Sequence, residues 1–93
     1  MIVRIASEGQ YVIPDDQADR LDELDNAAVH ACESGDQATF HRVFDDLLAF
    51  VRSAGTEVAP GELVGSDMIV PPADVSFEEA CAEFSGEGLL PNS

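Results

Sequence analysis

A cluster of acidic residues near the start of the chain is the first group of side chains whose type and spacing could do chemistry. Its members are Asp15, Asp16, Asp19, Asp22, Glu23 and Asp25. Carboxylates at this density could attract a hard cation, supply an acid and base pair, or dock a basic protein. The alternating acids and central glycine of an EF-hand loop are absent, and one helical surface cannot wrap a cation. Catalytic carboxylates would need a cleft with contrasting environments, which a chain of 93 residues has little room to build. The cluster therefore predicts a protein interface or a solvated helix face, and the sequence does not choose between the two.

Other chemically active residues give little support to an enzyme. The chain contains no lysine, which excludes a P-loop lysine, a Schiff-base lysine and a lysine general base. The two histidines, His30 and His41, fall on different expected helices, and neither has a partner at metal-ligand spacing. We expect both to be surface or boundary histidines. The sequence thus predicts no catalytic residue, no cofactor and no metal site.

The charge of the chain limits its partners. The chain has nineteen acidic residues and four arginines, which gives a formal charge of −15. Such a field repels the phosphates of nucleic acids and the anionic surface of a membrane, so direct binding to either is not expected. Proteins and cations remain as partners. The apolar fraction of 45% is that of a globular chain, so we expect one folded domain over residues 1–93.

The compartment can be inferred from the cysteines and from the N-terminus. Residues 1–5 are too short an apolar stretch for a signal peptide, and no stretch approaches the ~20 residues of a membrane span. We therefore expect a cytoplasmic protein. Cys32 and Cys81 are the only cysteines, both fall at apolar positions of expected helices, and a disulfide-stapled domain would carry more. Reduced core thiols are the prediction.

The N-terminal third predicts a β-hairpin followed by a helix. Residues 1–6 and 10–13 are β-rich, and the turn between them contains a glycine. Alternation puts Arg4 outside, and the core side of this hairpin should hold Val3, Ile5, Tyr11 and Ile13. Proline at position 14 ends the second strand, and Asp15 should cap a helix that runs to Gly35.

The rest of the chain predicts a second long helix, a late strand and a short helix. Asp36 should cap a helix with a broad apolar stripe, made of Phe40, Val43, Phe44, Leu47, Leu48 and Val51. Residues 56–58 could pair briefly with a strand, residues 67–70 form a clearer strand, and Ser76 begins the last helix. The apolar pair at positions 89–90 should pack back on the body. The expected fold class is α+β, in which a small antiparallel sheet (the N-terminal hairpin plus the late strand) packs with an αα-hairpin and a short C-terminal helix.

Five stretches along the chain are specific in their order and spacing. They are Met1-Ile2-Val3-Arg4-Ile5, Glu8-Gly9-Gln10-Tyr11, Leu24-Asp25, Ser66-Asp67-Met68-Ile69-Val70-Pro71-Pro72-Ala73-Asp74 and Gly86-Glu87-Gly88-Leu89-Leu90-Pro91. On these stretches the chain resembles the PspAA family. The resemblance implies a small bacterial or archaeal protein associated with PspA, the coiled-coil, membrane-remodelling protein of the envelope stress response. It supplies no catalytic motif, and neither cysteine belongs to it.

The leading hypothesis is a non-enzymatic adaptor or regulator that binds a PspA-like protein. Its acidic first helix would meet basic stretches of the coiled coil, and it would reach the membrane only through that partner. One alternative is a cation-dependent hydrolase that uses the acidic cluster. Another is a domain whose acidity reflects adaptation to a salty cytoplasm. The sequence leaves open whether the chain self-associates and whether it activates or restrains its partner.

Overall fold

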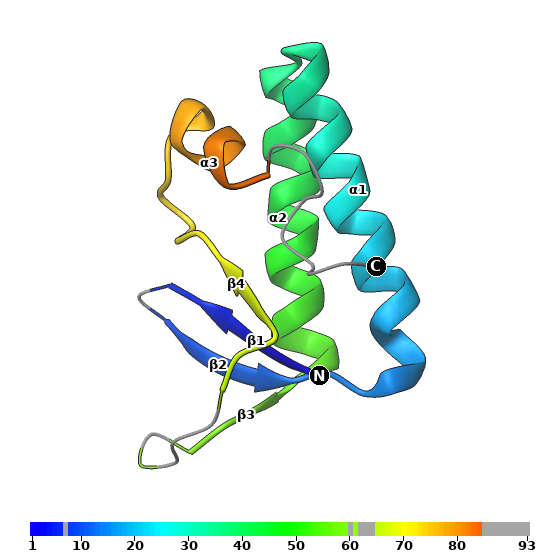
Figure 1. Ribbon diagram of the computed structural model, residues 1–93, viewed down its shortest axis with the longest axis vertical. Coiled ribbons are helices and arrows are strands. Elements are labelled where there is room, and N and C mark those ends of the chain that lie inside the picture. Colours follow the sequence, from blue (N-terminus) through cyan, green and yellow to red (C-terminus); the bar gives the residue numbers. More distant parts are fainter. Residues whose placement is uncertain (7, 60, 62–64, 85–93) are drawn as a thin grey trace.

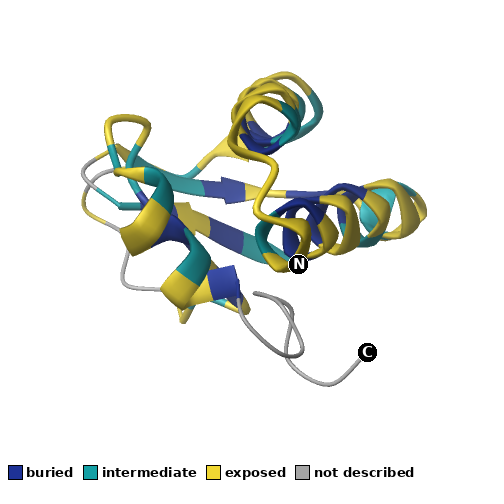
Figure 2. Cartoon of the chain, turned by 90° about the horizontal axis from the view of Figure 1, so that it is seen from above, coloured by how far each residue is buried: buried dark blue, intermediate teal, exposed yellow. Residues whose placement is uncertain are grey.

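The computed structural model describes residues 1–6, 8–59, 61 and 65–84, and it has the α+β architecture that the sequence predicts (Figure 1). The strands are β1 (Ile2–Ile5), β2 (Gly9–Val12), β3 (Thr56–Glu57) and β4 (Met68–Val70). The helices are a short 3-10 helix η1 (Asp15–Gln17), then α1 (Ala18–Ser34), α2 (Gln37–Ala54) and α3 (Phe77–Phe84). The two long helices form a hairpin, and α2 lies across one face of the sheet (Figures 1 and 2).

The N-terminal hairpin has the predicted faces. Val3 stands opposite Tyr11, and Arg4 stands opposite Gln10. Successive side chains of a strand point to opposite faces, so Val3 is buried against the helices while Arg4 is exposed on the outer face. Ile5, Tyr11 and Ile13 are buried as expected.

The sheet is mixed and not antiparallel throughout, which corrects the sequence expectation. Its strand order is β3-β2-β1-β4, and β4 pairs with β1 in parallel. The Ala6 N–H donates to the Val70 carbonyl at 2.9 Å, and the Asp67 N–H donates to the Ile2 carbonyl at 2.8 Å. β2 is antiparallel to both β1 and β3, so β3 runs in the same direction as β1. β4, at the other edge of the sheet, also runs in the direction of β1. Residue alternation alone carries no information about such a crossover.

The αα-hairpin is built from local signals. Gly35 has φ of 68°, the left-handed conformation that ends many helices and that glycine adopts without a steric penalty. Asp36 begins α2, and its carboxylate accepts a hydrogen bond from the Thr39 N–H at 3.1 Å. The expected cap at Asp15 is wrong, since the side chain of Asp15 makes no capping hydrogen bond and η1 precedes α1. The N–H of Ala18 is instead bonded to the backbone carbonyl of Asp15.

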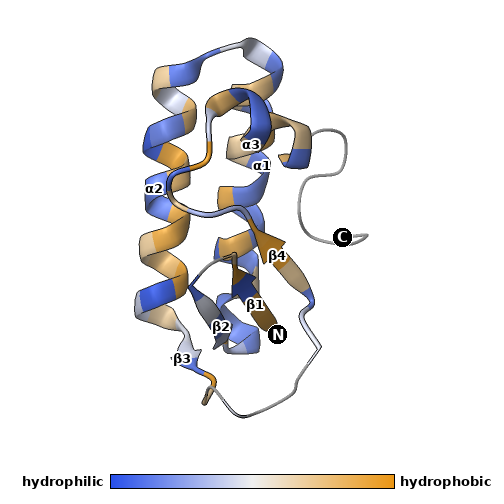
Figure 3. Cartoon of the chain, turned by 90° about the vertical axis from the view of Figure 1, so that its left-hand side faces the viewer, coloured by the Kyte–Doolittle hydropathy of each residue, from blue (hydrophilic) through white to orange (hydrophobic). Residues whose placement is uncertain are grey.

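Aromatic rings from α2 and α3 form the centre of the core. Phe40 stacks on Phe44 with centroids 5.5 Å apart, and the edge of Phe84 meets both rings. Leu47 and Val51 continue the same stripe toward the sheet and are fully buried. Figure 3 shows apolar and hydrophilic positions alternating along α2, as its helical period requires.

The two cysteines form a disulfide, so the expectation of reduced thiols is wrong. Cys32 in α1 and Cys81 in α3 have Cα atoms 5.5 Å apart, in the range that disulfides require. Both residues are half-buried. The sequence prediction treated each cysteine within its own helix, whereas the fold packs α3 on the C-terminal half of α1. The predicted cap of the last helix is confirmed, because Ser76 Oγ accepts a hydrogen bond from the Glu79 N–H at 3.2 Å. The predicted packing of residues 89–90 lies outside the described residues.

Candidate functional site

The acidic cluster predicted to be an interface extends over η1 and the first half of α1, and the helix divides its members into an outer and an inner set. Asp15, Asp16, Asp19 and Glu23 are exposed; we call these four residues the acidic face. Positions separated by three or four residues lie on one side of an α-helix, so Asp19 and Glu23 of α1 point the same way, and Asp16 precedes them in η1. The opposite side holds Leu21, Leu24 and Ala28, which are buried. This packing fixes the acidic face outward.

Asp25 does not belong to the exterior. It follows Glu23 by two positions, which turns it by about 200° around a helix of 3.6 residues per turn. Asp25 is fully buried, with 0% of its surface exposed, and it is not without an interaction partner. Its inclusion in the predicted interface is therefore corrected: the carboxylate of Asp25 cannot meet a partner on the outer side of α1.

Asp22 lies between the two sets. The residue is partly exposed, yet its Oδ1 atom is buried and has no hydrogen-bond partner within the described part of the chain. A buried acceptor that is left unpaired costs about 1–3 kcal/mol. Asp22 thus presents less of its carboxylate to a partner than an acid whose two oxygens are both in solvent, and Asp19 and Glu23 are the more exposed residues.

One cation stands on the acidic face. Arg20 donates to Glu23 at 3.1 Å, and the side chains are 56% and 67% exposed. An ion pair with this exposure contributes about 0–1 kcal/mol and exchanges readily for another partner. Asp15 lies 3.9 Å from the N-terminal ammonium of Met1 and is otherwise in solvent. The face therefore keeps a strong excess of negative charge.

A hollow of about 520 Å³ borders the acidic face. It lies where η1 approaches the C-terminal end of α2 and is lined by Pro14, Asp16, Gln17, Phe50, Ser53 and Ala54. The side chain of Phe50 is half-buried against the core. An acidic rim beside a partly exposed aromatic ring has the composition of a protein-docking surface, in which the ring is the anchor and the charges orient the partner.

The group with the most altered pKa lies elsewhere and has a structural role. Arg52 Nε donates to Glu8 Oε2 at 2.9 Å, its second guanidinium nitrogen bonds Oε1, and the Tyr11 hydroxyl donates to Oε2 at 2.7 Å. The hydrogen bond from Arg52, followed by that from Tyr11, lowers the pKa of Glu8 from 4.5 to about 2. The same contact with Glu8 raises the pKa of Tyr11. A carboxylate whose pKa is about 2 is a weak base, and this one ties the β1–β2 turn to the last turn of α2.

A metal site finds no geometric support in the residues that the structure describes. Within residues 1–6, 8–59, 61 and 65–84, no three His, Cys, Asp or Glu side chains gather in an arrangement that could hold a metal ion. His30 and His41 are both exposed, and His41 contacts Gln37, with nitrogens 3.5 Å apart, and the ring of Phe40. The same described ranges contain no helix with the length and apolar character that crossing a bilayer requires.

Sequence reasoning missed the disulfide, the contact of Glu8 with Arg52 and the hollow beside Phe50. Glu8 and Arg52 are 44 positions apart, and each looks like an ordinary surface charge in its own segment. The only local signal for the hollow was Phe50, an aromatic residue off the main apolar stripe of α2. Each of these features is formed by residues from different segments of the chain, so it can be identified only once the packing of those segments is known.

Comparison with known families gives one match. The family model PspAA, described as PspA-Associated protein, matches residues 1–92. The chain therefore belongs to the PspA-associated protein family. Comparison with curated proteins and with solved structures finds no match.

Proposed function

We propose that this member of the PspA-associated family is a non-enzymatic adaptor or regulator that binds a PspA-like coiled-coil protein of the envelope stress response. The observation that carries the proposal is the family match over residues 1–92, because the family is described by its association with PspA. The contact surface we propose is the acidic face together with the hollow beside Phe50. No observation in the described residues favours the cation-dependent hydrolase.

Charge supports this choice of surface. The chain carries a formal charge of −15, and the exposed carboxylates of the acidic face include Asp16 in η1 and Asp19 and Glu23 in α1. A partner helix with basic residues on one side would be attracted over distances comparable to the Debye length and aligned along α1. Phe50 would supply the apolar contact that charges alone lack. The same charge disfavours direct binding to nucleic acid or to an anionic membrane, so we propose that the chain reaches the membrane only through its partner.

Salt dependence of binding tests the electrostatic part of the proposal. The partner is a purified PspA-like protein, and its dissociation constant is measured by calorimetry or biolayer interferometry. Raising the salt from about 0.05 M to about 0.5 M shortens the Debye length to roughly a third, so we expect affinity to fall steeply. The variant Asp16→Asn/Asp19→Asn/Glu23→Gln should weaken binding at low salt and flatten the salt dependence. An affinity indifferent both to salt and to these substitutions would remove the acidic face as the interface.

A matched control separates the acidic face from general acidity. Asp45 and Asp46 are exposed on α2, and Glu33 is exposed in the last turn of α1. The variant Glu33→Gln/Asp45→Asn/Asp46→Asn removes the same number of charges outside the acidic face and should bind almost as well as the parent. Equal losses in the two variants would indicate that only the net charge matters.

A co-purification experiment tests the partner and the compartment that we propose. The tagged chain, purified from its native cells, should bring down a long coiled-coil protein in the cytoplasmic fraction, and it should enter the membrane fraction only when that protein is present. The chain contains a disulfide, and disulfides are more typical of an oxidising compartment than of the cytoplasm. The alternative outcome of the fractionation is therefore that the chain is recovered from such a compartment. Recovery of the chain outside the cytoplasm would contradict the proposed location.

A further inference from the structure

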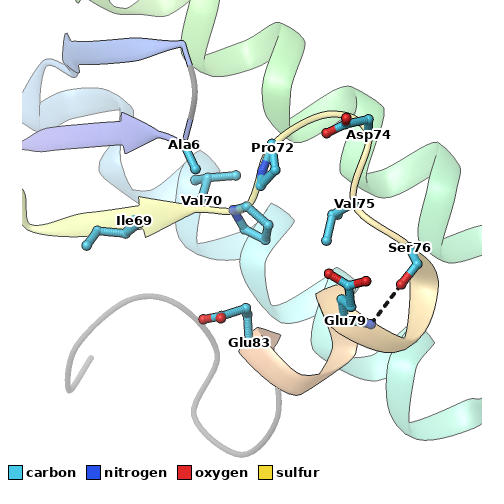
Figure 4. A pocket seen from close by; sticks show the side chains of 10 residues that line it. Ala6, Ile69, Val70, Pro72, Asp74, Val75, Ser76, Glu79 and Glu83 are labelled. Carbon is cyan, nitrogen blue, oxygen red and sulfur yellow. Dashed lines mark hydrogen bonds between the residues drawn. The ribbon is translucent and has the colours of Figure 1, made fainter.

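A second hollow lies at the end of β4, and it differs from the acidic face in shape and in composition. Its volume is about 460 Å³, and it lies between β4, the loop that follows β4, and α3 (Figure 4). Apolar residues form its floor: Ala6, Ile69, Val70, Pro71, Pro72 and Val75. Asp74, Ser76, Glu79 and Glu83 form its rim. We call this hollow the β4–α3 groove. In Figure 1, β4 and α3, which line it, lie on the opposite side of α2 from the first half of α1.

One side of the β4–α3 groove is a sheet edge that no other described strand pairs with. β4 is the last strand in the order β3-β2-β1-β4 and pairs with β1 alone among the described strands. The carbonyl of Val70 accepts a hydrogen bond from Ala6, so the backbone groups of Val70 face β1. Backbone groups of successive strand residues point to alternate sides, so the N–H and C=O of Ile69 face this edge. An edge of this kind is a template for an added strand.

The side chain of Ile69 supports the same conclusion. It is 59% exposed, the largest exposure of any large apolar residue in the described part of the chain, while Met68 and Val70 on either side are buried. Figure 4 shows Ile69 on β4 and Pro72 on the loop that follows β4, and both residues line the groove. An apolar side chain placed across Ile69 and Pro72 would remove both surfaces from water.

The rim of the groove carries uncompensated negative charge. Glu79 and Glu83 are four positions apart on α3, a spacing at which like charges repel on a helix surface. Asp74 adds a third carboxylate, and none of the groove's lining residues is basic. Figure 4 shows Glu79 and Glu83 on the side of α3 that is turned toward β4. A cationic side chain placed between them would relieve their repulsion.

We propose that the β4–α3 groove binds an extended segment of another protein in which apolar residues alternate with lysine or arginine. The segment adds a strand to β4 through the backbone groups of Ile69. Its apolar side chains cover Ile69 and Pro72, and its cationic side chains meet the carboxylates of Asp74, Glu79 and Glu83. The period of two in a strand places these two kinds of side chain on opposite sides, toward the floor and toward the rim. This site goes beyond the proposed adaptor function, because it takes a strand and lies away from the acidic face.

The probe for this site is a dye-labelled, end-blocked peptide in which valine and lysine alternate. Fluorescence anisotropy with the full chain should show saturable binding, and the counterpart with glutamate in place of lysine should not bind. N-methylation of the backbone nitrogens on one edge of the peptide removes the N–H that would donate to the Ile69 carbonyl, while keeping the charges and the peptide carbonyls. At about 0.5–1.5 kcal/mol for a hydrogen bond, losing this bond should weaken binding by roughly two- to tenfold.

Two groove variants and two matched controls locate the binding. Ile69→Ser removes the exposed apolar contact, and Glu79→Gln/Glu83→Gln removes two rim charges. Each should weaken peptide binding by about three- to tenfold, the first through lost apolar burial and the second because an exposed ion pair contributes up to about 1 kcal/mol. The control for the first is Val12→Ser, which alters another exposed apolar residue of the sheet, 41% exposed. The control for the second is Asp45→Asn/Asp46→Asn, which removes two exposed charges from α2. Both controls should bind like the parent.

Several outcomes would overturn the proposal. They are an absence of peptide binding, an equal loss in the groove variants and their controls, and undiminished binding of the N-methylated peptide. Sedimentation velocity adds another: if the parent is a dimer and Ile69→Ser is a monomer, the groove receives a second copy of the chain and not a basic segment. The acidic-face variant should bind the peptide normally, so failure here leaves the proposed binding of a PspA-like protein untouched.

Discussion

Loss of the disulfide should remove a large part of the chain's stability, and the magnitude follows from its position. Cys32 and Cys81 are separated by 49 positions, so their bond closes a loop that contains α2 and the last strand. The chain-entropy estimate for a loop of this length is about 4 kcal/mol. A chain of 93 residues has a total unfolding free energy of roughly 5–14 kcal/mol, at about 0.05–0.15 kcal/mol per residue. Reduction should therefore leave a marginally stable fold.

The assay is thermal unfolding followed by circular dichroism, for the parent with and without a phosphine reductant and for the variant Cys32→Ser/Cys81→Ser. A loss of 2–4 kcal/mol corresponds to a fall in Tm of about 8–30 °C for a domain of this size. The reduced parent and the double variant should melt at similar temperatures. Reductant should not move the Tm of the double variant, which serves as the control for effects of the reagent.

Hydrogen exchange shows which part of the fold loses stability when the disulfide is removed. α3 is held on α1 by the disulfide and on α2 by the ring of Phe84, so the amides of α3 should lose protection before those of α2. The reasoning is refuted if thiol titration shows complete reduction of the parent while its Tm and the protection of α3 stay unchanged. Such a result would mean that packing alone holds α3 in place.

Three further predictions concern residues of the fold. Phe44→Ala should lower the unfolding free energy by about 3–5 kcal/mol, measured by urea denaturation, because a stacked and fully packed ring is lost; a melt that matches the parent would contradict this. The pKa of Glu8 is lowered from 4.5 to about 2, so its pair with Arg52 stabilises the fold above pH 4.5 and this contribution is lost as the pH falls toward 2. The free energy of unfolding should drop by about 1 kcal/mol over that interval, and the drop should be smaller in Arg52→Gln, which keeps only the hydrogen bond from Tyr11. Gly55→Ala should destabilise the chain even though no unusual backbone angle is involved, since the added Cβ would lie 2.6 Å from the carbonyl oxygen of Val51; an unchanged Tm would show that the neighbouring backbone can move aside.

The parts of the fold that sequence reasoning predicted correctly depend on neighbours along the chain. The end of α1 follows from Gly35, which reaches a left-handed conformation without strain, and the start of α2 follows from Asp36. The buried positions of α2 follow from the period of the helix, beginning with Phe40. Each signal lies within a few residues of the feature that it sets, so no tertiary information was needed.

The parts that were missed depend on residues far apart in the sequence. The disulfide joins cysteines of two helices that are 49 positions apart, and no local pattern indicates that these helices pack together. The parallel pairing of β4 with β1 depends on which edge of the sheet the chain reaches. Asp25 looks like one more surface acid in a run of acids, yet the helical turn places it in the core. The sequence thus predicted which stretch of the chain holds the candidate interface, but not which of its acids are exposed. The prediction did not separate the outer acids of α1 from the inner ones.

α3 couples the disulfide to the β4–α3 groove, and this coupling gives a final prediction. Cys81 and Glu79 are two positions apart, so they lie on nearly opposite sides of α3: Cys81 bonds to α1, while Glu79 and Glu83 form the rim of the groove. Freeing α3 from Cys32 should loosen the rim and lower the affinity for the alternating valine–lysine peptide. Cys32→Ser/Cys81→Ser should then bind the peptide more weakly than the oxidised parent, at a temperature where circular dichroism shows both to be folded. Equal affinities would mean that Ala80 and Phe84, both fully buried, hold α3 in the same position without the covalent bond.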